Sequence, residues 1–122
     1  MKILIVDDDD DFRSLIASTL QRDGHETREL NDGSDVVDAL SAFDTDVLIT
    51  DIFMPTVDGI ETILSARNHD QNLWIVAVSG NEQYLDISLK LGANVSLEKP
   101  FTKADLISSL ATGVSASNAE CN

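Results

Sequence analysis

The sequence has little cysteine and no long apolar run, two features that would each point to a class of protein. Its single cysteine, Cys121, allows no disulfide within the chain, which favours a reducing compartment. It has no apolar run of about 18 residues, the length that a transmembrane helix requires. The apolar start MKILIV is too short for a signal-peptide core. We therefore expect a cytoplasmic protein.

Basic residues are also scarce. The chain has 8 lysines and arginines against 22 aspartates and glutamates, so its net charge is −14. Nucleic acids and anionic membranes bind positive surfaces, and this charge disfavours both as partners. It favours cations and basic protein surfaces.

The length of 122 residues and the hydrophobic content of 43% suit one compact domain. We expect this domain to cover residues 1–111. The remainder, residues 112–122, is small and polar enough to form a short C-terminal tail.

Short apolar runs alternate along the chain with segments of helical periodicity. The predicted strands are Ile3–Val6, Glu26–Leu30, Val47–Ile49, Leu73–Val78 and Asn94–Glu98. The predicted helices are Asp10–Gln21, Ser34–Phe43, Asp58–Ala66, Asn81–Leu91 and Thr102–Leu110. Strands that alternate with helices predict an α/β fold, (βα)5, with a parallel five-stranded sheet and helices on both faces.

Several residues predict where the helices begin and end. Ser34 is a candidate N-cap, and Gly92 is placed to end a helix. Thr102 and Asp105 have the spacing of a capping box. In the first helix, one apolar face is expected to contain Phe12, Leu15, Ile16 and Leu20.

Polar side chains follow the predicted strands where each strand ends. Ligands of such sheets bind beyond the carboxyl ends of the strands, so we expect these side chains to meet at one edge. They are Asp7 and Asp8, Asp51, Ser79 and Lys99.

This set of residues needs an added charge of some kind. Two carboxylates about 4 Å apart repel each other by about 4 kcal/mol at an effective dielectric of about 20, so one must take up a proton or a cation must join them. Magnesium prefers oxygen ligands, lysine suits a phosphate oxygen, and an aspartate can be phosphorylated as a nucleophile. The site therefore predicts phosphoryl transfer onto a carboxylate.

Four motifs in order give the chain a family resemblance over nearly its whole length. They are ILIVDD (residues 3–8), DIFMPTVDG (51–59), AVSG (77–80) and GANVSLEKPF (92–101). With them the chain resembles the receiver domain of two-component response regulators. The resemblance implies a flavodoxin-like doubly wound sheet with strand order 2-1-3-4-5.

The resemblance also implies roles for the residues around the phosphoryl group. Asp51 resembles the phosphoacceptor, Ser79 the hydroxyl that bonds the phosphoryl group, and Lys99 the lysine that pairs with it. Pro100 follows a peptide bond that is often cis in this family, an arrangement that would help to aim Lys99.

The implied metal is Mg²⁺, with Mn²⁺ as an alternative. Asp8 resembles its direct acidic ligand, and Asp7 a second acid that acts partly through water. Asp51 and the backbone carbonyl of Phe53 complete the implied ligand set. The next three residues, Asp9, Asp10 and Asp11, suit the first turn of a helix, where the macrodipole favours negative charge.

One position departs from the family pattern. Many receivers have an aromatic residue three positions before the lysine, where this chain has Ser96. A serine cannot fill the same space, so we expect an altered output. That output is expected on the face formed by residues 81–91, 94–98 and 102–110, where a downstream protein would bind.

The sequence thus predicts a phosphorylation-controlled signalling switch. It would catalyse no reaction beyond its own phosphorylation and dephosphorylation at Asp51, with a histidine kinase or phosphotransfer protein as the donor. Two alternatives remain open: a receiver used as a phosphorylation-independent binding module, and a phosphatase of the haloacid-dehalogenase type. We expect either a stand-alone receiver or the N-terminal part of a longer protein.

Overall fold

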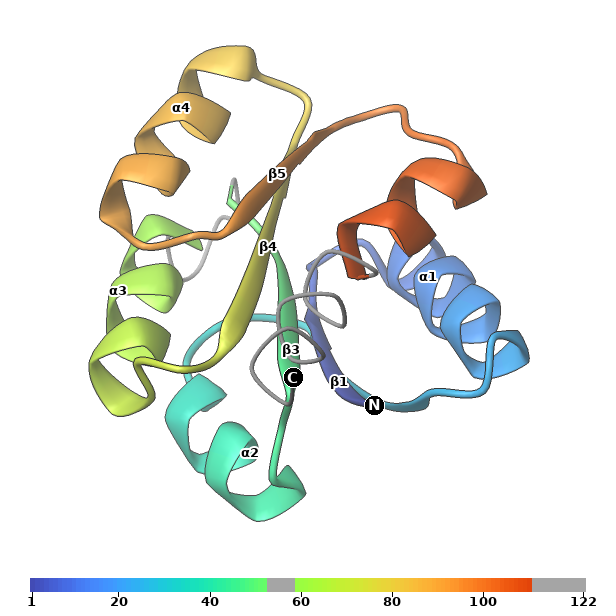
Figure 1. The fold of residues 1–122 in the computed structure, drawn as a ribbon, viewed down its shortest axis with the longest axis horizontal. Coiled ribbons are helices and arrows are strands. Elements are labelled where there is room, and N and C mark those ends of the chain that lie inside the picture. Colours follow the sequence, from blue (N-terminus) through green and yellow to red (C-terminus); the bar gives the residue numbers. More distant parts are fainter. Residues whose placement is uncertain (53–58, 111–122) are drawn as a thin grey trace, which may run out of the picture.

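The computed structural model describes residues 1–52 and 59–110. Within them, five parallel strands form one sheet with the order β2-β1-β3-β4-β5 (Figure 1). The strands are β1 (Lys2–Val6), β2 (Glu26–Leu30), β3 (Val47–Asp51), β4 (Trp74–Ser79) and β5 (Val95–Glu98). The predicted flavodoxin-like fold and its strand order are confirmed.

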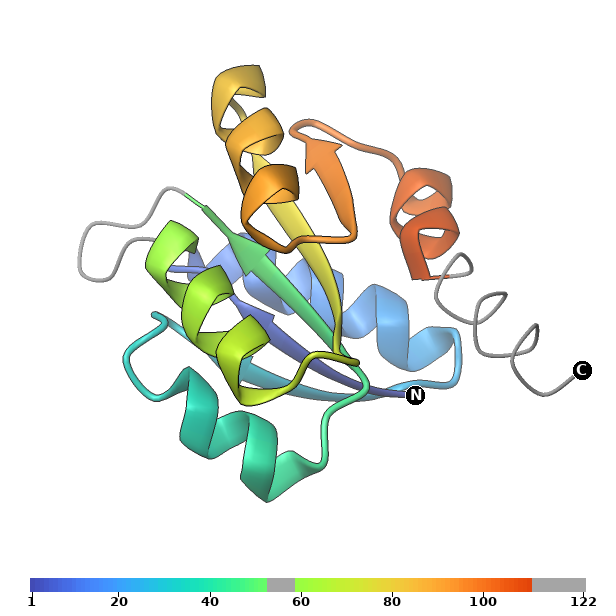
Figure 2. The ribbon, with the colours of Figure 1, turned by 60° about the vertical axis from the view of Figure 1, so that its left-hand side comes forward.

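Helices cover both faces of the sheet. Helices α2 (Val36–Phe43), α3 (Gly59–His69) and α4 (Glu82–Leu91) lie on one face. Helix α1 (Asp10–Arg22) and a fifth helix, described over residues 103–110, lie on the other (Figures 1 and 2). None of the helices in the described part of the chain has the length and apolar character needed to cross a bilayer.

The two helix layers define two halves of the core. Alternate residues of a strand point to opposite faces, so Leu4 of β1 packs toward α2 and α3 while Ile5 packs toward α1. All five residues of β3 are buried, as expected for a strand covered on both sides. The edge strand β2 has no fully buried residue, which explains its weak apolar pattern.

Two predicted helix signals are confirmed. The N–H of Thr102 donates to the Asp105 carboxylate at 3.1 Å, and the N–H of Asp105 donates to the Thr102 hydroxyl at 3.0 Å. This is the reciprocal pattern of a capping box. Gly92 ends α4 with a φ of 130°.

Other predictions of detail were wrong. Ser34 is not an N-cap, because its N–H donates to the Asp32 carboxylate at 2.8 Å in a turn that delays α2 until Val36. Leu15 is 63% exposed, and Ala17 is buried on the inner face of α1 instead. Helix α3 continues beyond Ala66 to His69. The predicted tail lies outside the described residues.

Candidate functional site

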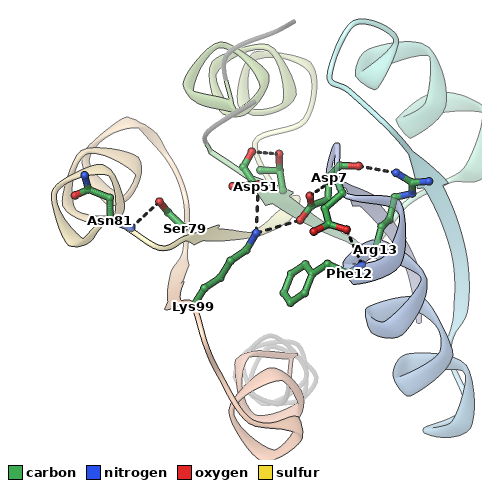
Figure 3. A network of polar contacts seen from close by, with 9 residues as sticks. Asp7, Phe12, Arg13, Asp51, Ser79, Asn81 and Lys99 are labelled. Carbon is green, nitrogen blue, oxygen red and sulfur yellow. Dashed lines mark hydrogen bonds and ion pairs between the residues drawn. The ribbon is translucent and has the colours of Figure 1, made fainter. Parts of the chain in front are cut away.

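The polar residues at the strand ends gather at one edge of the sheet, as predicted (Figure 3). Asp7 follows β1, Asp51 and Ser79 are the last residues of β3 and β4, and Lys99 follows β5. Strands β1 and β3 are neighbours in the sheet although β2 lies between them in sequence. The site therefore lies where the winding direction reverses, the usual ligand position in such sheets.

Three carboxylates form the centre of the site. Asp7, Asp8 and Asp51 each place one oxygen within 4.8 Å of the others. Asp7 and Asp51 are buried, with 2% and 7% of their surface exposed, whereas Asp8 is exposed. The acidic pocket thus has a buried floor and one side open to solvent.

Lys99 bridges the two buried acids. Its Nζ lies 3.3 Å from Asp51 Oδ2 and 3.5 Å from Asp7 Oδ2. The Lys99 backbone N–H donates to the Ser79 carbonyl at 2.9 Å, which ties the end of β5 to the end of β4. The Lys99–Pro100 peptide bond is cis, as the resemblance implied.

The pKa of Asp7 reflects both its burial and the charges around it. Burial, reinforced by the neighbouring charge of Asp51, raises the pKa of Asp7 above its usual value. A hydrogen bond from the Asp9 N–H at 2.9 Å and the charge of Lys99 oppose this rise without cancelling it. The pocket has three carboxylates and one lysine, and its oxygen-only donor set fits Mg²⁺.

Arg13 supports the loop that contains Asp7, a role that the sequence did not reveal. Its guanidinium donates to the Asp7 carbonyl at 2.7 Å, to Asp10 at 2.7 Å and to Glu29 at 3.1 Å. Arg13 thereby links β1, the start of α1 and the end of β2. Only the Asp10–Arg13 spacing, one helical turn, could have suggested part of this network.

Gly59 sets the distance between α3 and the end of β3. Its N–H donates to the Ile52 carbonyl at 2.9 Å. A Cβ at this position would collide with the Asp51 carbonyl oxygen and with backbone atoms of Ile52. Only glycine lets α3 begin this close to the predicted phosphoacceptor.

Ser79 is 2% exposed, and its hydroxyl accepts a hydrogen bond from the Asn81 N–H at 3.0 Å. Asn81 is the N-cap of α4 and accepts from the Gln83 N–H at 2.9 Å. The Ser79 hydroxyl therefore supports the start of α4 and can still donate one hydrogen bond. Ser96 lies half-buried on β5, in register with Ala77, and Phe53 falls outside the described residues.

Comparison with known proteins is consistent with this geometry. Residues 3–111 match the family described as response regulator receiver domain. This chain belongs to that family. Receivers are signalling modules rather than catalytic enzymes, which argues against the phosphatase alternative. The pocket of three aspartates and Lys99 is consistent with a phospho-accepting switch.

Full-length relatives include transcriptional regulators. The receiver is 34% identical over 107 residues to the transcriptional regulatory protein CpxR of Escherichia coli, covering 87% of this chain and 46% of that protein. It is 36% identical over 101 residues to the Regulator of RpoS of Escherichia coli, covering 81% of this chain and 30% of that protein. The receiver thus spans less than half the length of these relatives.

Solved structures of similar size also match. The chemotaxis protein CheY4 of Vibrio cholerae superposes with a TM-score of 0.83 at 28% identity, over 91% of this chain and 96% of that one. The receiver domain of NtrX from Brucella abortus gives a TM-score of 0.87 at 28% identity, over 93% and 98% of the two chains.

Proposed function

We propose that this receiver is a switch controlled by phosphorylation of Asp51. The phosphoryl group would come from a histidine kinase, the partner that a receiver implies, or from a histidine phosphotransfer protein. The observation that supports this most directly is Lys99 Nζ, 3.3 Å from Asp51 at the edge of a pocket with two further carboxylates. A lysine here could pair with a phosphoryl oxygen on Asp51 without a large movement.

In the proposed transfer, an Asp51 carboxylate oxygen attacks the phosphorus of a phosphohistidine. The phosphorus–nitrogen bond breaks, and its electron pair stays on the partner's imidazole. Lys99 pairs with one phosphoryl oxygen, and the Ser79 hydroxyl donates to another. Bound Mg²⁺ would neutralise charge on the phosphoryl oxygens. Its proposed ligands are Asp7, Asp8, Asp51 and the Phe53 carbonyl.

The phosphoryl group on Asp51 would carry a charge of about −2 near neutral pH at the end of β3, in place of the single charge of the carboxylate. Movement of Ser79 toward this charge would break its bond to the Asn81 N–H and so alter the start of α4. We propose that a downstream protein reads this change on the face formed by α4, β5 and residues 103–110. Ser96, on β5 of that face, lacks the bulk of the aromatic residue common in the family.

The first test is intact mass after incubation with Mg²⁺ and a small-molecule phosphodonor. We expect one hydroxylamine-labile phosphoryl group on the wild-type chain. The Asp51→Asn variant and a magnesium-free sample should carry none.

Three results would contradict the proposal. A phosphoryl group that persists in Asp51→Asn would place the acceptor elsewhere. No adduct from either a phosphodonor or a histidine kinase, with partner binding unaffected by Asp51→Asn, would favour the phosphorylation-independent binding module. Turnover of many equivalents of a phosphomonoester would indicate a phosphatase.

A further inference from the structure

An aromatic ring lies directly against the lysine of the site. Phe12, on the first turn of α1, places its ring centroid 4.3 Å from Lys99 Nζ (Figure 3). A cation within about 6 Å of a ring face is attracted to the negative face of the aromatic quadrupole. Lys99 therefore has three attractive neighbours: two carboxylates and this ring.

Contacts other than the ion pairs of Lys99 also hold the Phe12 ring in place. The Phe12 N–H donates to the Asp9 carboxylate at 3.1 Å, which fixes the start of α1. Phe101 meets the Phe12 ring edge-on, with centroids 5.7 Å apart and an interplanar angle of 78°.

A ring restrains the ammonium group in a different way from an acid. A nearby carboxylate offsets the lysine charge, whereas a phenyl ring attracts the ammonium and carries no net charge. The Lys99 side chain is 27% exposed and has a flexible four-carbon stem, so without the ring it could move toward solvent. Holding it in place beforehand reduces the ordering that phosphoryl binding must otherwise impose.

We infer that Phe12 is a positioning residue for phosphoryl capture, which holds the charged Lys99 beside Asp51 through its ring face. This inference rests on the proposed function of Asp51. Phe12 also packs against the half of the core that includes Ile16 and Leu106. A packing role alone would be satisfied by any apolar side chain of similar size, whereas a role toward Lys99 requires an aromatic ring.

The test is the affinity for the phosphoryl mimic beryllofluoride in the presence of Mg²⁺. The variants are Phe12→Leu, which keeps an apolar side chain, and Phe12→Tyr, which keeps the ring. Phe101→Leu is the matched control, because it removes the neighbouring ring and keeps the Phe12 ring, whose backbone stays anchored by the Asp9 carboxylate. We expect about a fivefold weaker affinity for Phe12→Leu, equivalent to ~1 kcal/mol, with the other two close to wild type.

A second measurement follows Lys99 without metal or mimic. The ¹H resonances of the Lys99 Cε methylene should be shifted upfield by the ring in the wild type, Phe12→Tyr and Phe101→Leu. They should return toward the ordinary lysine position in Phe12→Leu. Thermal unfolding establishes that each variant is folded, and Phe12→Met replaces Phe12→Leu if the latter is not.

The possible failures are distinguishable. If the wild type binds no beryllofluoride, the proposed function fails and the inference fails with it. If Phe12→Leu binds as tightly as the wild type, or keeps the upfield Lys99 resonances, the inference alone is wrong. Equal losses in Phe12→Leu, Phe12→Tyr and Phe101→Leu would show that packing, rather than the ring face, governs the affinity.

Discussion

Asp7 is the most buried acid of the site, with 2% of its surface exposed, and it shares Lys99 with Asp51. Its pKa is higher in the folded chain than the usual value near 3.8, mainly because of burial. The folded state therefore binds the Asp7 proton more tightly than the unfolded state does. As the pH rises from the unfolded pKa through the folded pKa, this acid progressively lowers the free energy of unfolding, and the full penalty applies above the folded pKa.

We therefore predict that Asp7→Asn stabilises the magnesium-free protein at pH 7, by about 1 kcal/mol or ~4 °C in melting temperature. The gain should shrink as the pH is lowered toward the unfolded pKa. Thermal unfolding across this range measures both effects. Asp11→Asn is the control, because it removes one exposed charge from the first turn of α1. An equal gain in Asp11→Asn would attribute the effect to net charge instead of burial.

The acids and the lysine of the site could be predicted because each lies at or just after the end of a strand, and parallel strands end at one edge. Phe12 and Arg13 could not be identified in the same way. Their contacts depend on how α1 is rotated about its own axis relative to the sheet. The hydrophobic pattern predicts which side of the helix faces the sheet, but it does not fix the direction of each side chain. Leu15 shows this limit: it fits the apolar period and yet is exposed.

At the level of helices and strands, the first residue of α3 lies against the end of β3, where the backbone of Asp51 and Ile52 leaves no room for a Cβ on Gly59. We predict that Gly59→Ala forces α3 away from Asp51 and Ile52 and lowers the free energy of unfolding by about 2 kcal/mol. Phosphorylation of Asp51 should also become slower, because the backbone that holds the acceptor moves.

Gly80→Ala is the matched control for this variant. A Cβ at Gly80 has no neighbour within 4 Å, so its stability should stay close to that of the wild type. Urea unfolding measures the stability of both variants. If Gly59→Ala were as stable as Gly80→Ala, α3 could begin at this distance without glycine.

The helices and strands were predictable from the periodicity of their apolar residues, but some of the residues at which they begin or end were not. Helix α4 ends at Gly92 as expected, because glycine tolerates a φ of 130° that other residues avoid. Helix α2 begins later than expected, because Asp32 accepts from the Ser34 N–H in the preceding turn. The formation of this turn depends on local geometry that the spacing of residues alone does not specify.

For the whole molecule, the net charge of −14 means that folding brings like charges together. We predict that raising the NaCl concentration from about 20 mM to about 300 mM increases the melting temperature by a few degrees. Mg²⁺ at matched ionic strength should add a further increase, because a ligand that binds only the folded state stabilises it.

The second increase is expected to require the acidic pocket. Asp8→Asn should abolish the magnesium-specific gain and keep the response to NaCl. Asp86→Asn, which removes an exposed acid from α4, should keep both. A magnesium-specific gain that survives in Asp8→Asn would mean that the ion binds elsewhere on this acidic surface.

Three of the five consecutive aspartates that precede and begin α1 have separate partners. Asp7 contacts Lys99, Asp9 accepts from the Phe12 N–H, and Asp10 pairs with Arg13. Deleting one aspartate would still leave four, but every later residue of α1 would turn by about 100° around the helix axis. Phe12 would leave Lys99, and Arg13 would leave the Asp7 carbonyl. The run therefore acts as a spacer. Its length, more than its charge, determines which side chains of α1 face the site.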